Sequence, residues 1–332
     1  MKKVNYPLIA ILALFIAMLV STIDLSKTIR ISSSVICEDS LSVDAYYNLP
    51  SKVNGEKRNI SNDLNKLKNL EFTQKELLYL ELRKEIITNL NIDELYNNLE
   101  KKSLDVRTIN SKKYENYTEH ELLVFDEYIG CYNVLLLTPS IINKKLPAII
   151  GLHGHDDTNQ IFKEKYMGKD LANLGYVVIM PQFRAMEGKD WGAKEVNVST
   201  YLYNNGFSLM GIRMYESLLL IKYLKSLDYV DQNNIGIIGH SGGSTTANLL
   251  VRTTKHIKAL VTDNTWNFDE LITNFVKEEE VGIIHCKIYP ELYEYHKNID
   301  DWSTLEIPFM HVPYAFEKNR AEIINFFDKH LK

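Results

Sequence analysis

The chain has few cysteines and lacks the cysteine and histidine patterns that hold metal ions. Its three cysteines, Cys37, Cys131 and Cys286, are far apart and form no Cys-x-x-Cys pair. No His-Glu-x-x-His motif is present either. Because structural and catalytic zinc sites need such closely spaced ligands, the sequence predicts no metal site. Three cysteines also give no disulfide framework, although they would allow one disulfide outside the cytoplasm.

Two further signatures, those of nucleotide binding and of nucleic-acid binding, are absent. There is no Gly-x-Gly-x-x-Gly and no Gly-Lys-Ser/Thr, the motifs whose backbones cradle phosphates. The net charge is −5, and no basic stripe is interleaved with aromatic residues. We therefore expect no cofactor and no nucleic-acid partner. What is present is a hydrophobic fraction of 45% over 332 residues, enough for one large globular domain with an extension.

The N-terminus carries the longest apolar run of the chain. A short positive segment, Met1-Lys2-Lys3, precedes unbroken apolar residues from Leu8 to Val20. This arrangement is typical of an export signal or a signal-anchor. Only the weak Leu19-Val20-Ser21 resembles a cleavage site, so we expect an uncleaved anchor. The expected membrane contact is through residues 4–23, with the rest of the chain outside the cytoplasm. A buried N-terminal core helix is the alternative.

The pattern divides the chain into three parts. Residues 1–25 are the expected signal-anchor or signal peptide, 26–110 a tether and helical extension, and 111–332 the main domain. Within the second part, leucine and isoleucine recur at three-to-four spacing from Leu64 to Leu99. This spacing predicts an amphipathic helical extension that covers the main domain.

Beyond residue 110, short apolar runs alternate with stretches of helical periodicity. The runs predict strands at 117–125, 131–137, 147–152, 176–180, 235–238, 259–262 and 306–311. Helices are expected at 162–174, 208–227 and 317–331, a helical region at 268–295, and a polar stretch at 184–205. Strands alternating with helices predict an α/β fold with a doubly wound, mostly parallel sheet.

The sequence Gly239-His240-Ser241-Gly242-Gly243 lies between a predicted strand and a predicted helix. In that context the pattern Gly-x-Ser-x-Gly indicates a nucleophile elbow. A strained turn exposes the Ser241 hydroxyl, and the glycines on either side keep Cβ atoms out of the crowded crossing. Ser241 is therefore the candidate nucleophile. A phosphate-binding turn and a simple loop are the competing interpretations.

Four motifs carry a family resemblance: Leu152-His153-Gly154-His155, Gly175-Tyr176-Val177-Val178, the stretch Val230 to Ile235, and the elbow. With them, the segment from about Leu122 to Thr265 resembles the α/β-hydrolase superfamily, in its dienelactone-hydrolase and acetyl-xylan-esterase-like branch. The resemblance implies that Ser241 is the nucleophile. It also implies an oxyanion hole made by the N–H of Gly242 and a backbone N–H near Gly154 or His155. The imidazoles of His153 and His155 are expected to hold this loop.

The family pattern weakens after the elbow, where the base and the acid should lie. Only one strand is predicted there and no Gly-His pair follows the elbow, which predicts a C-terminal part shortened by about a strand–helix unit. His311 is the candidate base because it ends the last predicted strand. Asp263 is the candidate acid because it directly follows the strand at 259–262. His285 and His296 are expected to be surface or packing residues, and Asp300 and Asp301 a helix end or turn. In an alternative alignment, Tyr314 takes the place of the family histidine.

Together, these features predict a serine hydrolase that cleaves a small-molecule carboxylic ester through an acyl-enzyme. The alternative is a catalytically degenerate protein of the same fold that binds a small molecule or a partner. Peptidase or thioesterase activity is a lesser option. Trp191 and the segment Tyr201-Leu202-Tyr203 either line a pocket or pack in the core. The oligomeric state is open.

Overall fold

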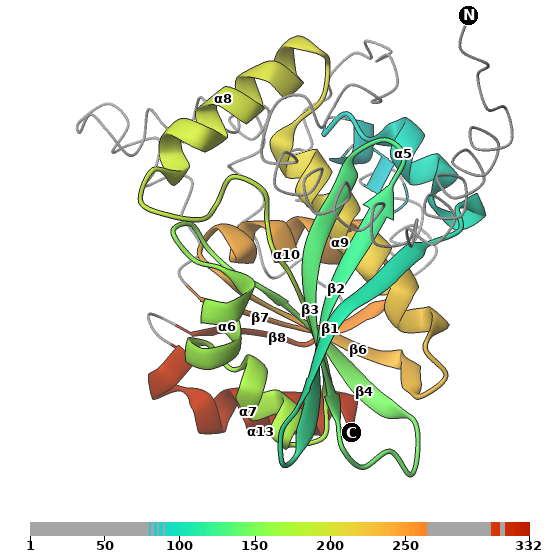
Figure 1. The fold of residues 1–332 in the computed structure, drawn as a ribbon, viewed down its shortest axis with the longest axis vertical. Helices are drawn as coiled ribbons and strands as arrows, with labels where there is room; N and C mark the ends of the chain where they lie inside the picture. The colour runs from blue at the N-terminus through green and yellow to red at the C-terminus, as the bar shows by residue number, and fades with distance from the viewer. Residues whose placement is uncertain (1–79, 81–82, 85, 89, 264–306, 313–315) are drawn as a thin grey trace, which may run out of the picture.

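The computed structural model describes residues 80, 83–84, 86–88, 90–263, 307–312 and 316–332 (Figure 1). These residues form an 8-stranded sheet in the order β1-β2-β3-β5-β4-β6-β7-β8. The strands are β1 (Asp105–Lys113), β2 (Tyr117–Asp126), β3 (Gly130–Pro139), β4 (Leu146–Leu152), β5 (Val177–Pro181), β6 (Val230–His240), β7 (Ile257–Asp263) and β8 (Phe309–Val312). The helices are α5 (Asp93–Asn98), α6 (Asn159–Lys165), α7 (Gly168–Asn173), α8 (Trp191–Asn204), α9 (Leu209–Ser226), α10 (Gly242–Thr253) and α13 (Arg320–Leu331), with short 3-10 helices η3 (Leu99–Lys101) and η6 (Phe316–Lys318).

The sheet is parallel from β5 to β8, and β1, β2 and β3 extend it as antiparallel strands. From β4 the chain proceeds to β5 on one side and later to β6 on the other. The strand order therefore reverses at β4. In open α/β sheets, ligands bind outside the carboxyl ends of the strands at such a switch point. The predicted oxyanion loop and the elbow follow these two strands, β4 and β6.

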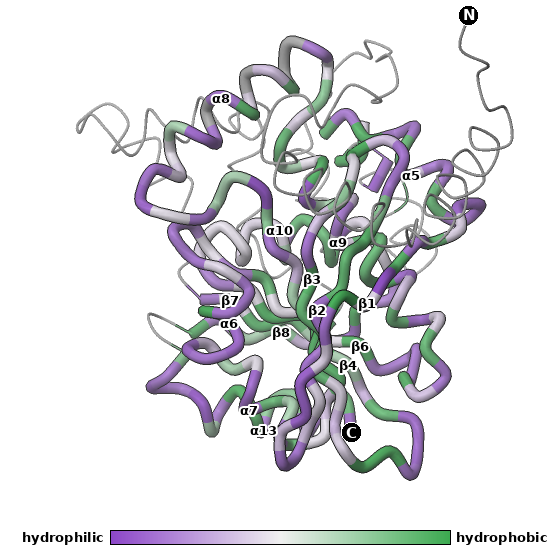
Figure 2. Tube along the Cα trace, in the orientation of Figure 1, coloured by the Kyte–Doolittle hydropathy of each residue, from purple (hydrophilic) through white to green (hydrophobic). Residues whose placement is uncertain are grey.

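Helices cover both faces of the sheet. Successive residues of β4 pack on opposite sides, Ile150 with α5, α8, α9 and α10, and Ile149 with α6, α7 and α13. Figure 1 shows α7 and α13 together, away from α8 and α9. The strands are hydrophobic along the centre of the sheet, whereas many of the outer segments are hydrophilic (Figure 2). Burial on both faces explains why β4, β5 and β6 are continuous apolar runs.

Most predicted elements are present. Strands occur at all seven expected places. The helix expected at 208–227 is α9, and Ser208 caps its N-terminus because its Oγ accepts the N–H of Gly211. The expected single helix at 162–174 is instead two short helices, α6 and α7. The break lies at Met167, which takes the left-handed conformation with φ 118°. The polar stretch at 184–205 contains a helix, α8, that the sequence pattern did not indicate.

The end of the predicted helical extension packs on the main domain. Ile87, Leu90 and Leu95 are buried in the core on the α9 side of the sheet. Ser208 Oγ donates to Leu90 O at 3.0 Å, and Tyr96 Oη donates to Thr253 O at 3.1 Å. The strand β1 spans residue 110, where the sequence placed a boundary.

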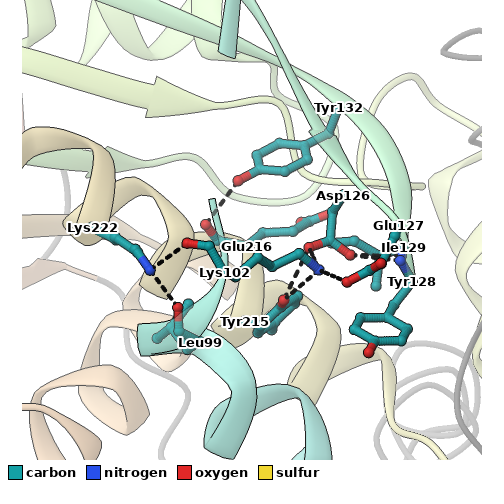
Figure 3. Close-up of polar contacts among 10 residues, drawn as sticks. All are labelled: Leu99, Lys102, Asp126, Glu127, Tyr128, Ile129, Tyr132, Tyr215, Glu216 and Lys222. Carbon is teal, nitrogen blue, oxygen red and sulfur yellow. Dashed lines mark hydrogen bonds and ion pairs between the residues drawn. The ribbon is translucent and has the colours of Figure 1, made fainter. Parts of the chain in front are cut away.

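A polar cluster fixes this junction (Figure 3). Lys102 Nζ lies 2.6 Å from Asp126 Oδ2, which also accepts a hydrogen bond from Tyr215 Oη. Lys222 Nζ donates to three carbonyl oxygens at the end of η3, those of Leu99, Glu100 and Lys102. The pKa of Tyr215 is raised chiefly by burial and, to a smaller extent, by the charge of Asp126. Its hydroxyl therefore stays protonated and donates the hydrogen bond.

Several predictions fall on residues outside the described part of the chain. These are the anchor and tether up to residue 79, the helical region at 268–295, and the residues His285, His296, Asp300, Asp301 and Tyr314. No helix within the described ranges is long and apolar enough to cross a membrane.

Candidate active site

Ser241 lies on a tight turn between the end of β6 and the start of α10. Its backbone has φ 50° and ψ −118°, an uncommon conformation for a residue with a side chain. Gly239 and Gly243, two positions before and after Ser241, leave no room for a side chain. A Cβ on Gly239 would lie 2.5 Å from Gly243 O, and one on Gly243 would lie 2.3 Å from Leu152 O. The predicted strand–turn–helix geometry of the elbow is confirmed.

The loop after β4 crosses directly over this turn. A Cβ on Gly154 would lie 2.8 Å from Ser241 Cβ, and one on Gly242 would lie 2.6 Å from His155 Cε1. The structure therefore brings together Ser241, Gly242, Gly154 and His155, the residues proposed as nucleophile and oxyanion hole. The N-terminus of α10, where helix dipoles favour negative charge, begins at the same turn.

His153 holds the loop from inside the core. Its side chain is buried, its Nδ1 is 2.9 Å from Gly154 O, and its Nε2 accepts the N–H of Phe183 at 2.9 Å. These partners require the tautomer with the proton on Nδ1. Burial lowers the pKa of His153 to about 3, which keeps the ring neutral. The expectation that His153 holds the loop agrees with these contacts.

This histidine should make stability depend on pH. An unfolded histidine has a pKa of about 6.5, so below that pH the unfolded chain binds a proton that the folded chain excludes. The contribution is complete above pH 6.5 and is lost as pH falls toward 3, by at most about 1.4 kcal/mol per pH unit. Urea unfolding at pH 7, 6 and 5 should show a shallower loss in His153→Gln, which keeps an acceptor but does not titrate. Equal slopes in both proteins would contradict this assignment.

His155 faces α8. Its Nε2 lies 3.1 Å from Glu195 Oε2, and its ring lies against Trp191, with the centroids 4.4 Å apart and the planes tilted by 38°. Trp191 therefore lies beside the candidate site. Leu202, in contrast, is buried in the core and Tyr201 packs against it, so these two residues serve packing.

Asp263 ends β7 and is fully buried. Its carboxylate oxygens lie 2.7 and 2.9 Å from His240 Nδ1, and Oδ1 accepts the N–H of Ser241 at 3.3 Å. His240 Nε2 faces Asp157 Oδ2 at 3.6 Å, and its ring stacks on Tyr166. Burial raises the pKa of Asp157, and the His240 charge opposes this shift. Sequence reasoning missed this His240 pairing.

His311 is exposed on β8, where its Nδ1 lies 3.2 Å from Thr262 Oγ1. The strand register explains why it does not contact Asp263. His311 is opposite Thr262, whereas Asp263 is opposite Val312 on one side and His240 on the other. Neighbouring residues of a strand point to opposite faces, so Asp263 turns toward His240. Within the described ranges, no hydrogen bond joins Ser241 Oγ to an imidazole.

Comparison with solved structures identifies the fold. An acetyl xylan esterase from Paenibacillus sp. R4 matches with TM-score 0.56 and 12% identity, over 73% of this chain and 94% of that one. Acetyl xylan esterase 1 from Thermoanaerobacterium sp. JW/SL YS485 matches with TM-score 0.50 and 14% identity, over 75% and 98%. At these identities the likeness shows the fold alone. The chain has the α/β-hydrolase fold.

Other comparisons cover less of the protein. A Bacteroides fragilis NCTC 9343 protein, provisionally described as an acetyl xylan esterase, matches with TM-score 0.50 and 17% identity over 65% of this chain. The chain spans 64% of that protein's length. The family described as "BAAT / Acyl-CoA thioester hydrolase C terminal" matches residues 219–304, less than half of the chain. No curated protein sequence matches.

The predicted α/β-hydrolase sheet is confirmed. In the described residues, a single strand, β8, follows β7. The residues of the elbow and of the His153–His155 loop meet at its carboxyl edge, whereas the two residues proposed as base and acid face different neighbours.

Proposed function

We propose that this α/β-hydrolase-fold protein is a serine hydrolase that cleaves carboxylic esters. The observation that carries the proposal is the strained Ser241 turn with the His153–His155 loop packed over it. A serine held in this way presents its hydroxyl at the carboxyl edge of the sheet. The acetyl xylan esterases of similar fold support ester cleavage as the reaction type.

The reaction proceeds through an acyl-enzyme. Ser241 Oγ attacks the acyl carbon while its proton passes to a base, and the carbonyl electrons move to the oxygen. The N–H groups of Gly242 and of the loop at Gly154 and His155 donate to that oxyanion, each worth about 3 kcal/mol. Collapse of the intermediate expels the alcohol, which takes the proton. Water then attacks the acyl-enzyme in the same way, releasing the acid and restoring Ser241.

His311 is the proposed base. It stands at the carboxyl end of the sheet, one strand from Asp263, and its described polar partner is the neutral Thr262 hydroxyl. Burial lowers the pKa of His311, and the charge of Asp263, the proposed acid, opposes this shift without a hydrogen bond between the two side chains. Catalytic hydrogen bonds are often completed only when substrate binds, so the unliganded geometry is compatible with this role.

Replacing His311 with alanine should reduce kcat by about 10²- to 10⁴-fold, the usual contribution of a general base. The measurement is initial-rate hydrolysis of p-nitrophenyl acetate. His330→Ala, on α13 against Phe326, is the matched control and should keep the wild-type rate. An unchanged kcat in His311→Ala would remove His311 from the mechanism and direct attention to the other imidazoles near Ser241.

A comparison of oxygen esters with thioesters tests which type of bond the protein cleaves. We expect purified protein to hydrolyse p-nitrophenyl acetate and other oxygen esters. Acyl-CoA thioesters form the second arm, because the partial family match includes thioester hydrolases. Preference for thioesters would replace the proposed substrate class, and inactivity toward both would favour the next candidate.

The second candidate is a non-catalytic binding protein with the same fold. The observation that favours it is that Asp263 pairs with His240, while no imidazole among the described residues bonds Ser241 Oγ. Such a protein would fold normally and bind a ligand at the switch point without turnover.

We also propose that the protein acts outside the cytoplasm, anchored by residues 4–23. The apolar run from Leu8 to Val20 supports this location. In cells expressing the full chain, the protein should remain with membranes after an alkaline carbonate wash. Recovery in the soluble cytoplasmic fraction would contradict the proposal.

A further inference from the structure

Three ionisable side chains connect two helices to the loop over Ser241. Glu195 on α8 and Arg213 on α9 are completely buried, and Arg213 Nη2 donates to Glu195 Oε1. The second carboxylate oxygen of Glu195 lies 3.1 Å from His155 Nε2. Arg213, Glu195 and His155, here called the Glu195 series, therefore run from the core of the molecule to the edge of the candidate active site.

The charges in this series depend on one another. Burial alone would favour the protonated form of Glu195, but the Arg213 and His155 charges hold its pKa below the usual range. A buried guanidinium likewise needs a carboxylate, because an uncompensated buried charge is strongly destabilising. Arg213 Nη2 also donates to Arg184 O at 2.8 Å, which ties the pair to the loop after β5. Glu195 is thus a fixed anion facing His155.

The imidazole of His155 is held from two sides. Trp191, one helical turn before Glu195, packs against the ring in a tilted arrangement with centroids 4.4 Å apart. On the other side the ring approaches Gly242 so closely that a Cβ there would lie 2.6 Å from Cε1 and 2.9 Å from Nδ1. Gly242 is the residue whose N–H would meet the oxyanion. The ring therefore links the position of α8 to the position of that N–H.

The buried ion pair at the junction with the helical extension differs in this respect. Asp126 with Lys102 joins the extension to the main domain, and its described contacts include no residue of the elbow or the oxyanion loop (Figure 3). The His240–Asp263 pair also reaches the elbow, where Asp263 accepts the N–H of Ser241, whereas the Glu195 series ends on a ring that approaches Gly242. A purely structural ion pair would not need to end at His155, beside the Gly242 N–H.

We propose that Glu195 and Arg213 are positioning residues of the oxyanion site: through His155 they fix the backbone N–H groups of His155 and Gly242. This inference rests on the proposed ester hydrolysis. An oxyanion exists only in the transition state and the intermediates, so loosening its donors lowers kcat and leaves substrate binding unchanged. The predicted signature is therefore a loss in kcat at nearly constant KM.

The test compares Glu195→Gln with Asp126→Asn in the full chain, using p-nitrophenyl acetate. Glu195→Gln should lower kcat about 10- to 100-fold with KM within about twofold of wild type. Asp126→Asn removes a buried carboxylate elsewhere and should lower the melting temperature with kcat within about twofold. Glu195→Asp, which keeps the charge, should recover part of the lost rate.

His155→Asn gives a second route if Glu195→Gln does not fold. It should lower kcat by a similar factor, and where both variants fold the double variant should lose no more than the larger single loss, because both act through one ring. Wild-type kcat in either folded variant, or an equal kcat loss in Asp126→Asn, would overturn the inference. An inactive wild-type protein would instead refute the proposed function, so the two failures are distinguishable.

Discussion

Ser241→Ala is expected to lower kcat for ester hydrolysis by on the order of 10⁴- to 10⁶-fold, the largest catalytic effect anticipated for this protein. Without Oγ no acyl-enzyme forms, and only the oxyanion donors and substrate binding remain. Stability should change little, because the Ser241 side chain makes no capping hydrogen bond to α10. Initial rates with p-nitrophenyl acetate, together with thermal unfolding, measure both effects.

Ser226→Ala is the matched control for this serine. Ser226 is exposed at the end of α9, where its hydroxyl donates to Tyr223 O. Its replacement should leave kcat within about twofold of wild type. Hydrolysis that persists at the wild-type rate in Ser241→Ala would mean that another group, or a contaminating enzyme, performs the reaction.

Gly243→Ala is expected to have the largest effect on stability, a decrease in the free energy of unfolding of about 3 kcal/mol. The added Cβ would lie 2.3 Å from Leu152 O and 2.6 Å from His153 O. Both are backbone atoms of β4 and the oxyanion loop, which cannot move as a side chain could. Relief of this overlap would push α10 away from the sheet. Urea unfolding of the two proteins measures the difference.

Gly175→Ala separates steric overlap from backbone strain. Gly175 has φ +91°, but a Cβ there would meet nothing within 4 Å. Its replacement should cost only about 1 to 2 kcal/mol, the price of a side chain in the left-handed region. If Gly243→Ala destabilised the protein no more than Gly175→Ala, close packing of the elbow against β4 would be wrong.

The central strands were predictable because each is an apolar run buried on two faces, as in 147–152 and 176–180. β1 was missed because its residues are mostly exposed and show no alternation of apolar and polar side chains. α8 was missed because its polar face and its glycine suggest a loop. α8 is stabilised by burial of Val198 and Leu202 in the core and by the contacts of Glu195 and Trp191 with partners far away in the sequence.

The elbow could be predicted from one motif because its requirements are local: a strained serine and glycines where backbones nearly touch. The pairing of His240 with Asp263 needed the register of two parallel strands, which place these residues side by side. With that register, the carboxyl ends of β6 and β7 would have indicated the contact. The Glu195–Arg213 series depends on how α8 and α9 are oriented on the sheet, which no local pattern encodes.

The most direct measurement is reaction of the folded protein with a fluorophosphonate probe, followed by intact mass and peptide mapping. If Ser241 is the activated nucleophile, one probe adds per chain, the adduct maps to Ser241, and Ser241→Ala is not labelled. A folded wild-type protein that stays unlabelled, or an adduct on a different residue, would contradict the assignment of this α/β-hydrolase-fold protein as a serine hydrolase acting through Ser241.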